Sequence, residues 1–498
     1  MVRPPERSTS IPRLWSLALA ATGLAALAGC RPAPPFKPFA GSLLMTVDSL
    51  RRDHVSAYGY RSPFGKHEAT TPAFEALAAG GVLFENALSS TSWTLPSHAS
   101  LFTGLPDPLH RVTENGARIA PALTTLAELH EQAGHATSGS FAGPNLHPAF
   151  GFAQGFEDWI DCSGVALDDE LFENAAEAAP GSFVGTHRAS HAAVTSPQTL
   201  AAAQGFLEQR AEDEQPFFLF AHWWDAHYDY TPPPEYVGRF VDPNYSGRFR
   251  GIRLIEKGLT AGPADVAFLK SMYDAEIRYT DDHISELLAD LERLGLAGST
   301  AVCLTSDHGE EFYEHERWGH QHTLYQEVLE IPLVIRAPGV APAGVRVPGA
   351  VQLQDLYATL ATLAGLEIPS YVESRDLTRL WEDPDQADRP AFAHLEVPLR
   401  EIKTSTWTLG RRKAQFDHAS GEGWFFDLTQ DPTEQHPRSL APLANSTDAA
   451  DQTLLGLLRE LARQEQARPG IPGANSTNRS EMSAELRQSL RDAGYLQD

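Results

Sequence analysis

Residues 92–104 read SWTLPSHASLFTG, and the rest of the chain can be placed around this stretch. Pro96 lies two residues after Thr94, and Gly104 follows the run. Proline near a helix start and glycine just past a helix end are the usual arrangement. We therefore predict a loop that carries Thr94 to the N-terminus of a short buried helix over residues 97–103. Free backbone N–H groups there suit a phosphate or sulfate, and a hydroxyl there can attack a bound anionic ester.

Apolar runs on both sides of this stretch predict the strands of a buried sheet. They lie at residues 42–47, 216–222, 300–305 and 332–336. Helical patterns alternate with them, at residues 72–79, 123–132, 199–210, 264–294 and 354–363. Continuous apolar strands that alternate with helices are typical of a mostly parallel sheet covered by helices on both faces. The sequence therefore predicts an α/β fold whose ligands bind at the edge where the strands end.

Acidic and imidazole side chains at two of these strand ends predict a metal site. Asp48 follows the first strand, and Asp307 and His308 follow the strand at 300–305. We expect all three to meet Thr94 at one edge of the sheet. Two carboxylates, an imidazole and a hydroxyl suit a divalent ion that activates the hydroxyl and binds an ester oxygen. Each residue alone has an ordinary structural explanation, so the hypothesis depends on their convergence.

Charge and cysteine usage exclude two classes of function. Among 498 residues, 39 Lys and Arg stand against 65 Asp and Glu, which gives a net charge of −26, and no basic run occurs. Nucleic acid is therefore not expected as a partner. The three cysteines form no CxxC pair or Cys/His cluster, which argues against a structural zinc site. An acidic protein that acts on anions must take its local positive charge from a metal ion, His or Arg.

The first 29 residues predict an export signal. Three arginines precede an apolar run over residues 14–28, which is too short and too poorly flanked for a membrane span. The run ends in LAGC and resembles a bacterial lipobox, in which Cys30 becomes the lipidated first residue after cleavage; a plain secretory signal is the alternative. We expect an exported protein that is lipid-anchored to the bacterial cell envelope, with the proline-rich residues 30–40 as a tether.

The sequence pattern changes near Arg400. Alternating segments rich in Thr, Trp and Phe follow it and predict a small antiparallel sheet. We divide the rest of the chain into a main domain, a small α+β subdomain and a tail with a terminal helix, at residues 41–395, 396–470 and 471–498.

A series of motifs in a fixed order resembles the sulfatase family of the alkaline phosphatase superfamily, over roughly residues 40–435. The first metal-ligand strand of the family resembles residues 43–60, and its nucleophile motif resembles TLPSHASLFTG. Further matches are RVTENG (111–116), DAHYDYTPP (225–233), TSDHGEEFYEH (305–315), GHQHTLYQEVLEIPLVIRAPG (319–339), FFDLTQDPTEQHP (425–437) and LRDAGYL (490–496). The resemblance implies an alkaline phosphatase-like fold and an enzyme that acts on an anionic ester.

The resemblance implies that Asp48, Asp307 and His308 bind one divalent metal ion. Thr94 would be the nucleophile and would also bind this ion. Formylglycine sulfatases carry Cys or Ser at the Thr94 position, and threonine cannot be converted to formylglycine. Ser49 lies where many calcium-dependent sulfatases have a second aspartate. Fewer oxygen ligands and one imidazole favour Mn²⁺ or Zn²⁺, with Ca²⁺ as the alternative.

The resemblance also implies contacts between matched side chains and the substrate. His227 would bind or protonate the ester, and Asn115 would contact a sulfuryl or phosphoryl oxygen. His320 lies where many relatives place a lysine that holds the anion. His98 occupies the arginine position of the C/S-x-P-x-R signature and is a candidate for substrate binding. Two weaker matches, which we expect to be structural, are His322 and Asn145.

These departures leave three functions open. The preferred hypothesis is hydrolysis of, or transfer from, a phosphate or phosphonate ester through Thr94. The first alternative is a sulfuric ester hydrolase that uses Thr94 directly. The second is a catalytically silent, surface-anchored protein that keeps the fold for binding. The sequence does not specify the alcohol part of a substrate or the oligomeric state.

Overall fold

The computed structural model describes residues 36–64, 66–114, 116–163, 194–228, 230–247, 261–384, 389–439 and 446–464. The predictions for the export signal with Cys30, for Asn115 and for the C-terminal tail lie outside these residues. Within the described ranges, no helix combines the length and apolar character that crossing a membrane requires.

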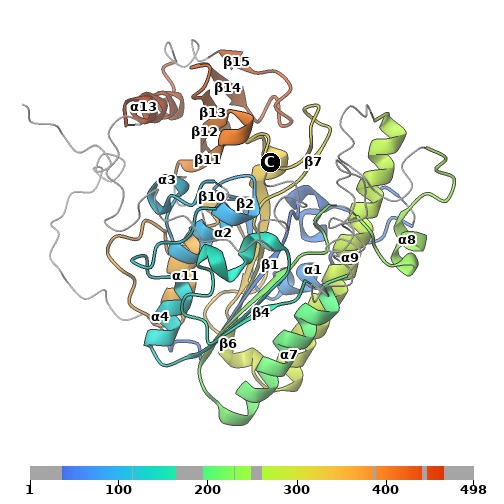
Figure 1. Ribbon diagram of the computed structural model, residues 1–498, viewed down its shortest axis with the longest axis vertical. Coiled ribbons are helices and arrows are strands. Elements are labelled where there is room, and N and C mark those ends of the chain that lie inside the picture. The colour runs from blue at the N-terminus through green and yellow to red at the C-terminus, as the bar shows by residue number, and fades with distance from the viewer. Residues whose placement is uncertain are drawn as a thin grey trace, which may run out of the picture. The chain divides into compact units, whose positions relative to one another are not determined.

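The larger of the two main sheets has eight strands. Helices lie on both sides of it (Figure 1). In spatial order the strands are β10 (Val345–Gln352), β2 (Val82–Leu88), β9 (Glu330–Arg336), β6 (Thr300–Ser306), β1 (Gly41–Val47), β5 (Phe217–Trp223), β3 (Ala136–Phe141) and β4 (Asp158–Asp161). Strand β9 runs antiparallel to its neighbours β2 and β6, and the other neighbouring strands pair in parallel. The predicted mostly parallel α/β sheet is confirmed.

Helices cover both faces of this sheet. One face packs against α2 (Thr94–Thr103), α4 (Leu126–Gln132) and α11 (Asp355–Leu363). The other face packs against α1 (Pro72–Ala79), α7 (Ser196–Asp213) and α9 (Pro263–Arg293). Side chains of β1 alternate between these two cores, since Leu44 joins the first and Leu43 and Met45 join the second. Short elements complete the domain: α3 (Asp107–His110), α8 (Pro234–Phe240), α10 (Gln326–Leu329), β7 (Glu311–Phe312) and β8 (Trp318–Gly319).

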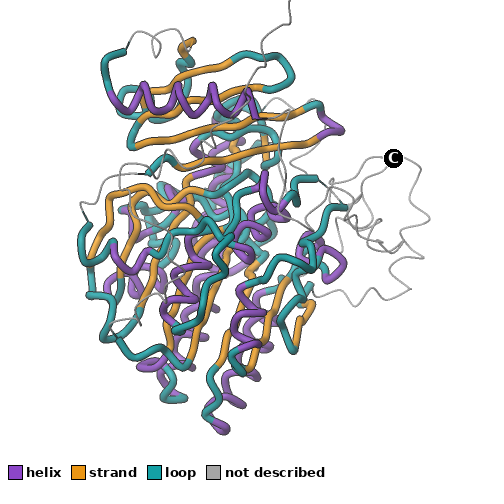
Figure 2. Tube along the Cα trace, turned by 90° about the vertical axis from the view of Figure 1, so that its left-hand side faces the viewer, coloured by secondary structure: helices purple, strands orange, loops and turns teal. Residues whose placement is uncertain are grey.

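The second main sheet is antiparallel, as predicted. Its strands are β11 (Ala391–Val397), β12 (Ile402–Leu409), β13 (Arg412–Asp417), β14 (Gly423–Asp427) and β15 (Arg438–Ser439). Helix α13 (Ala449–Gln464) lies against β12 and β13 (Figure 2). Its Leu454 and Leu455 pack with Ala414 of β13 and Phe425 of β14. Strand β11 begins five residues before residue 396, so it spans the predicted boundary between the two domains.

Three helices begin three residues away from their predicted starts. Helix α7 begins at Ser196 and not at residue 199. Helix α2 starts at Thr94 and not after it, and Ser97 N donates the first helical hydrogen bond to Trp93 O (3.3 Å). Pro96 is accommodated because N–H groups of a first turn have no intrahelical acceptor. Helix α4 starts at Leu126 and not at residue 123, because Thr125 caps it: Glu128 N donates to Thr125 Oγ1 (3.1 Å).

Candidate active site

The strand order brings the predicted metal-binding residues to one edge of the sheet. Strands β1 and β6 are parallel neighbours, and Val47 is in register with Ser306. The next residues along the two strands are Asp48 and Asp307, so their carboxylates leave the sheet side by side. His308 follows directly. This is the carboxyl-terminal edge at which open α/β sheets bind ligands.

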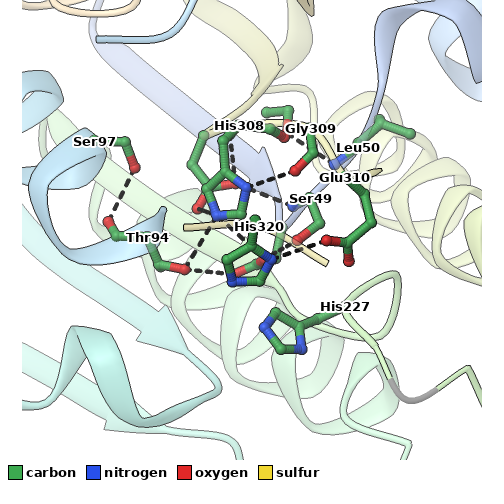
Figure 3. A network of polar contacts seen from close by, with 12 residues as sticks. Ser49, Leu50, Thr94, Ser97, His227, His308, Gly309, Glu310 and His320 are labelled. Carbon is green, nitrogen blue, oxygen red and sulfur yellow. Dashed lines mark hydrogen bonds and ion pairs between the residues drawn. The ribbon is translucent and has the colours of Figure 1, made fainter. Parts of the chain in front are cut away.

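Four residues predicted from the sequence meet there. The possible ligand atoms of Asp48, Asp307 and His308 all lie within 4.8 Å of one another, and all three residues are buried. Thr94 Oγ1 lies 3.3 Å from Asp48 Oδ2 and 3.4 Å from His308 Nε2. Figure 3 shows the Thr94 hydroxyl directed toward the His308 ring. The hydroxyl is therefore within reach of an ion that the cluster would hold.

The donor set fits a divalent metal ion. His308 Nδ1 donates to Gly309 O (2.8 Å), which directs Nε2 toward the carboxylates. Asp307 Oδ1 accepts hydrogen bonds from Ser49 N (3.1 Å) and His308 N (2.9 Å). Asp307 Oδ2 has no hydrogen-bond partner among the described residues and lies 3.4 Å from His308 Nε2. Each side chain is thus oriented by one atom and has another available for a cation.

Ser49, the residue after Asp48, supports the Asp48 carboxylate. Ser49 Oγ donates to Asp48 Oδ1 at 2.7 Å. Burial nevertheless raises the pKa of Asp48 to about 6, although His308, Ser49 and Thr94 lower it. A carboxylate that burial makes difficult to ionise is stabilised by a nearby cation. The pKa of Asp48 therefore supports the assignment of a metal site.

Two further histidines lie beside the carboxylates. His98 is fully buried, and its Nδ1 donates to Thr94 O (2.9 Å) and lies 3.6 Å from Asp307 Oδ2. These contacts indicate that His98 orients Thr94 and Asp307. They favour that role over the predicted contact with the substrate. His222 Nε2 lies 3.3 Å from Asp48 Oδ2. Burial lowers the pKa of His98 to about 3 and that of His222 to about 4.

The sequence interpretation missed His222. A polar residue near the end of the apolar stretch PFFLFAH was the available signal. Thr46 joins the two imidazoles, since its hydroxyl lies 2.9 Å from His222 Nδ1 and 3.2 Å from His98 Nε2.

His320 and His227 lie next to the candidate metal site. The ring centroid of His320 is 4.5 Å from that of His308 and 5.0 Å from that of His227 (Figure 3). His320 Nδ1 lies 3.0 Å from Glu310 Oε1, a contact that the sequence did not predict. Burial lowers the pKa of His320 and raises that of Glu310 well above its usual range. Trp224 stacks on His227 at 3.9 Å between ring centroids and fixes its plane.

The two weaker candidates have other surroundings. His322 is half-buried, and its Nδ1 lies 3.2 Å from Arg400 Nη1. Asn145 is buried beside α2, and its amide atoms have no hydrogen-bond partner within the described ranges.

Comparison with known proteins agrees with this geometry. Residues 42–366 match the family model Sulfatase. The ulvan-active sulfatase of Formosa agariphila is 26% identical over 411 residues, which cover 76% of this chain and 74% of that protein.

Solved structures share the fold. The phosphonate monoester hydrolase of Agrobacterium radiobacter aligns with a TM-score of 0.65 at 22% identity, over 86% of this chain and 96% of that one. A protein solved in complex with its substrate D-glucosamine-2-N,6-O-disulfate aligns with a TM-score of 0.65 at 20% identity, over 90% of this chain and all of that one. The fold is thus the predicted alkaline phosphatase-like fold, and the chain belongs to the sulfatase family of hydrolases.

Proposed function

We propose that this protein is a metal-dependent hydrolase or transferase of anionic esters that uses Thr94 as its nucleophile, with phosphate and phosphonate esters as preferred substrates and sulfate esters as the second candidate. One observation carries the proposal: Thr94 Oγ1 lies at the start of α2, 3.3 Å from Asp48 Oδ2 and 3.4 Å from His308 Nε2. The sulfatase and phosphonate hydrolase among the similar proteins support chemistry at sulfur or phosphorus.

Asp48, Asp307, His308 and Thr94 would hold the ion. A divalent ion bound there supplies positive charge to the ester oxygens and lowers the pKa of the threonine hydroxyl. The ion is proposed to be Mn²⁺ or Zn²⁺, because one donor is an imidazole.

The reaction follows as two displacements. Asp48 accepts the proton of the Thr94 hydroxyl, and Oγ1 attacks phosphorus in line with the leaving alcohol. The new Oγ1–P bond forms as the bond from phosphorus to the leaving oxygen breaks. His227 or His320 donates a proton to that oxygen. Water or an acceptor alcohol then attacks phosphorus as the Oγ1–P bond breaks. The imidazole that gave up its proton accepts the proton of the attacking group, and Asp48 returns the first proton to Thr94 Oγ1.

Threonine argues against the formylglycine route by which sulfatases release sulfate, and we therefore prefer phosphorus esters as substrates. Without an aldehyde hydrate, the covalent ester on Thr94 is released only by a second attack at phosphorus, or at sulfur in the second candidate function. The N-terminus of α2 and the metal site would hold the equatorial oxygens for both steps.

The export signal expected in the first 30 residues suggests where the protein would act. With Cys30 lipidated, the protein would be exported and anchored to the bacterial cell envelope, where it would meet a small anionic ester and no nucleic acid.

A substrate panel with a Thr94 variant tests the proposal. Metal analysis of the purified protein precedes assays with aryl phosphate, phosphodiester, phosphonate and aryl sulfate. We expect one divalent ion per chain, and we expect Thr94→Ala to lower kcat by about 10³-fold or more, while Thr94→Ser keeps measurable turnover. Thr103→Ala removes the same atoms at the other end of α2 and should keep activity.

Two results would contradict the proposal. Full activity of Thr94→Ala would exclude Thr94 as the nucleophile. Tight metal binding without turnover of any ester by the unaltered protein would favour the silent binding protein.

A further inference from the structure

Two arginines lie on one side of the candidate site. Burial lowers the pKa of the His322 imidazole to about 4, and the guanidiniums of Arg400 and Arg317 are close enough to contribute to this shift. The protein as a whole carries a net charge of −26. These two guanidiniums are therefore local positive charges that an anionic substrate can meet.

Arg400 is fixed next to the residues that carry His320. It ends a short 3-10 helix, η7 (Pro398–Arg400), in the connection between β11 and β12. Arg400 Nη1 donates to Gln321 O (3.3 Å) and lies 3.2 Å from His322 Nδ1. Gln321 N in turn donates to Ser92 O (3.0 Å), two residues before Thr94. The small sheet thus delivers a guanidinium to the segment that borders the nucleophile.

This guanidinium is not neutralised by a carboxylate. Within the described part of the chain, neither Arg400 nor Arg317 forms an ion pair, and both are at least partly exposed. The neighbouring arginines of the small sheet differ, since Arg411 pairs with Glu330 (3.4 Å) and Arg412 pairs with Asp448 (3.0 Å). In so acidic a protein, two arginines beside the site without a carboxylate are available to an external anion.

The donors of Arg400 have the right arrangement for an oxyanion. Its contacts within the described residues use Nη1 alone, so Nε and Nη2 remain available. These two nitrogens lie in one plane and bind a carboxylate, sulfate or phosphate through paired hydrogen bonds. In the proposed function, the ester group under attack is held at Thr94 and the candidate metal site, and not at Arg400.

We propose that Arg400, supported by Arg317 and held in place by His322, binds a second anionic group on the alcohol part of the substrate. The preferred substrates are then esters of alcohols that carry a carboxylate or a further sulfate or phosphate. This inference rests on the proposed ester hydrolysis and adds the substrate class.

Matched pairs of substrates test the inference. One pair is an aryl ester with a ring carboxylate and the same ester with a carboxamide; the second pair carries a sulfonate or a sulfonamide. The ratio of kcat/KM within a pair is independent of the fraction of active enzyme. We expect the unaltered protein to prefer at least one anionic member by about 10- to 100-fold. The pair with the larger ratio identifies a planar or a tetrahedral second anion.

Arginine variants complete the experiment. Arg400→Gln should bring the ratio close to one. Arg400→Lys should retain part of the preference, because lysine keeps the positive charge without the planar fork. Arg317→Gln should lower the ratio by a smaller factor than Arg400→Gln. Arg411→Gln removes a positive charge from the same sheet and should leave the ratio unchanged.

The outcomes separate this inference from the proposed function. Turnover of both members of each pair with equal efficiency by the unaltered protein would overturn the inference alone. A preference that persists in Arg400→Gln would also overturn it. If no ester is hydrolysed at all, the proposed function itself fails.

Discussion

At the residue scale, Thr94, His98 and Ser49, for which the sequence resemblance implies departures from the formylglycine pattern, lie close to one another. His98 donates to the Thr94 carbonyl, and Ser49 donates to Asp48, which in turn lies 3.3 Å from the Thr94 hydroxyl. The ring of His222 meets that of His98 edge-on at 4.9 Å between ring centroids. These residues therefore form one connected set of contacts.

Glu314 forms two ion pairs, and they allow a test of how electrostatic interactions contribute to stability. Its carboxylate lies 2.7 Å from Arg51 Nη1 and 3.0 Å from Lys270 Nζ. Burial raises the pKa of Glu314, but the two cations lower it to about 2, below its ordinary value of 4.5. The charged form therefore favours the folded state; its contribution is complete above pH 4.5 and is lost as the pH falls toward 2.

We expect Glu314→Gln to lower the free energy of unfolding by about 2 kcal/mol at pH 7. The difference from the unaltered protein should narrow as the pH falls from 4.5 to 3, as measured by urea unfolding across this range. Glu75→Gln, in the exposed Arg61–Glu75 pair, should change stability by less than about 0.5 kcal/mol. A Glu314→Gln effect that stays constant down to pH 3 would exclude the assigned pKa.

Residue type and position predicted that Asp48, Asp307 and His308 meet, but not which residues support them. Asp48, Asp307 and His308 each follow an apolar strand, so a strand pattern was enough to place them together. His222 lies inside such a strand, and Glu310 lies in an acidic run whose pattern does not mark one member. Their roles come from the pairing of β1 with β5 and β6, which no local pattern contains.

At the element scale, the sequence pattern did not reveal the direction of β9 or the presence of β3. The apolar run of β9 was predicted, but its direction was not. The 23 residues between β6 and β9 contain β7, β8 and the short α10 and no long crossover helix, and β9 pairs antiparallel with β6. Strand β3 reads ATSGSF, which contains few typical strand residues, yet it is fully buried. It is a strand because β5 and β4 pair with it on both sides.

Helix α7 depends on a carboxylate from the loop that carries His227. Asp225 accepts hydrogen bonds from Thr195 N (2.6 Å), Thr195 Oγ1 (2.6 Å) and Ser196 N (2.8 Å) at the helix start. Because the contacts are buried, Asp225→Ala leaves two N–H groups unpaired and should cost about 1–3 kcal/mol.

Unfolding midpoints and amide exchange at residues 195–199 would measure this effect. We expect faster exchange in Asp225→Ala, and a smaller effect in Asp225→Asn, which keeps one acceptor oxygen. An unchanged midpoint together with unchanged exchange in Asp225→Ala would show that the loop does not cap the helix.

At the scale of the whole molecule, the two sheets share one core. Ala391, Ala393, Leu395 and Val397 of β11 belong to the same hydrophobic cluster as α2 and α11. His394 N also donates to Ser90 O (2.8 Å). The change of sequence pattern near residue 400 correctly predicted a second sheet, but composition does not reveal that its first strand packs into the main core.

A buried ion pair joins the small sheet to the segment after His320. Lys413 of β13 is fully buried, and its Nζ lies 2.7 Å from Glu434 Oε1 and donates to Gln326 Oε1 (3.2 Å) and to Leu324 O. Glu434 Oε2 accepts a hydrogen bond from Gln326 N (2.6 Å). These contacts connect the sheet to the chain only four residues beyond His320.

We expect Lys413→Ala to destabilise the protein by about 3–5 kcal/mol, because it leaves Glu434 as an unpaired buried charge. The double variant Lys413→Met with Glu434→Gln removes both charges and keeps most of the volume, so it should recover most of the lost stability. Thermal unfolding at a fixed scan rate compares the variants, since a protein of this size need not unfold reversibly. If the double variant were as unstable as Lys413→Ala, the loss would come from packing and not from the unpaired carboxylate. Because the pair holds residues close to His320, ester turnover should fall in Lys413→Ala and return in the double variant together with stability.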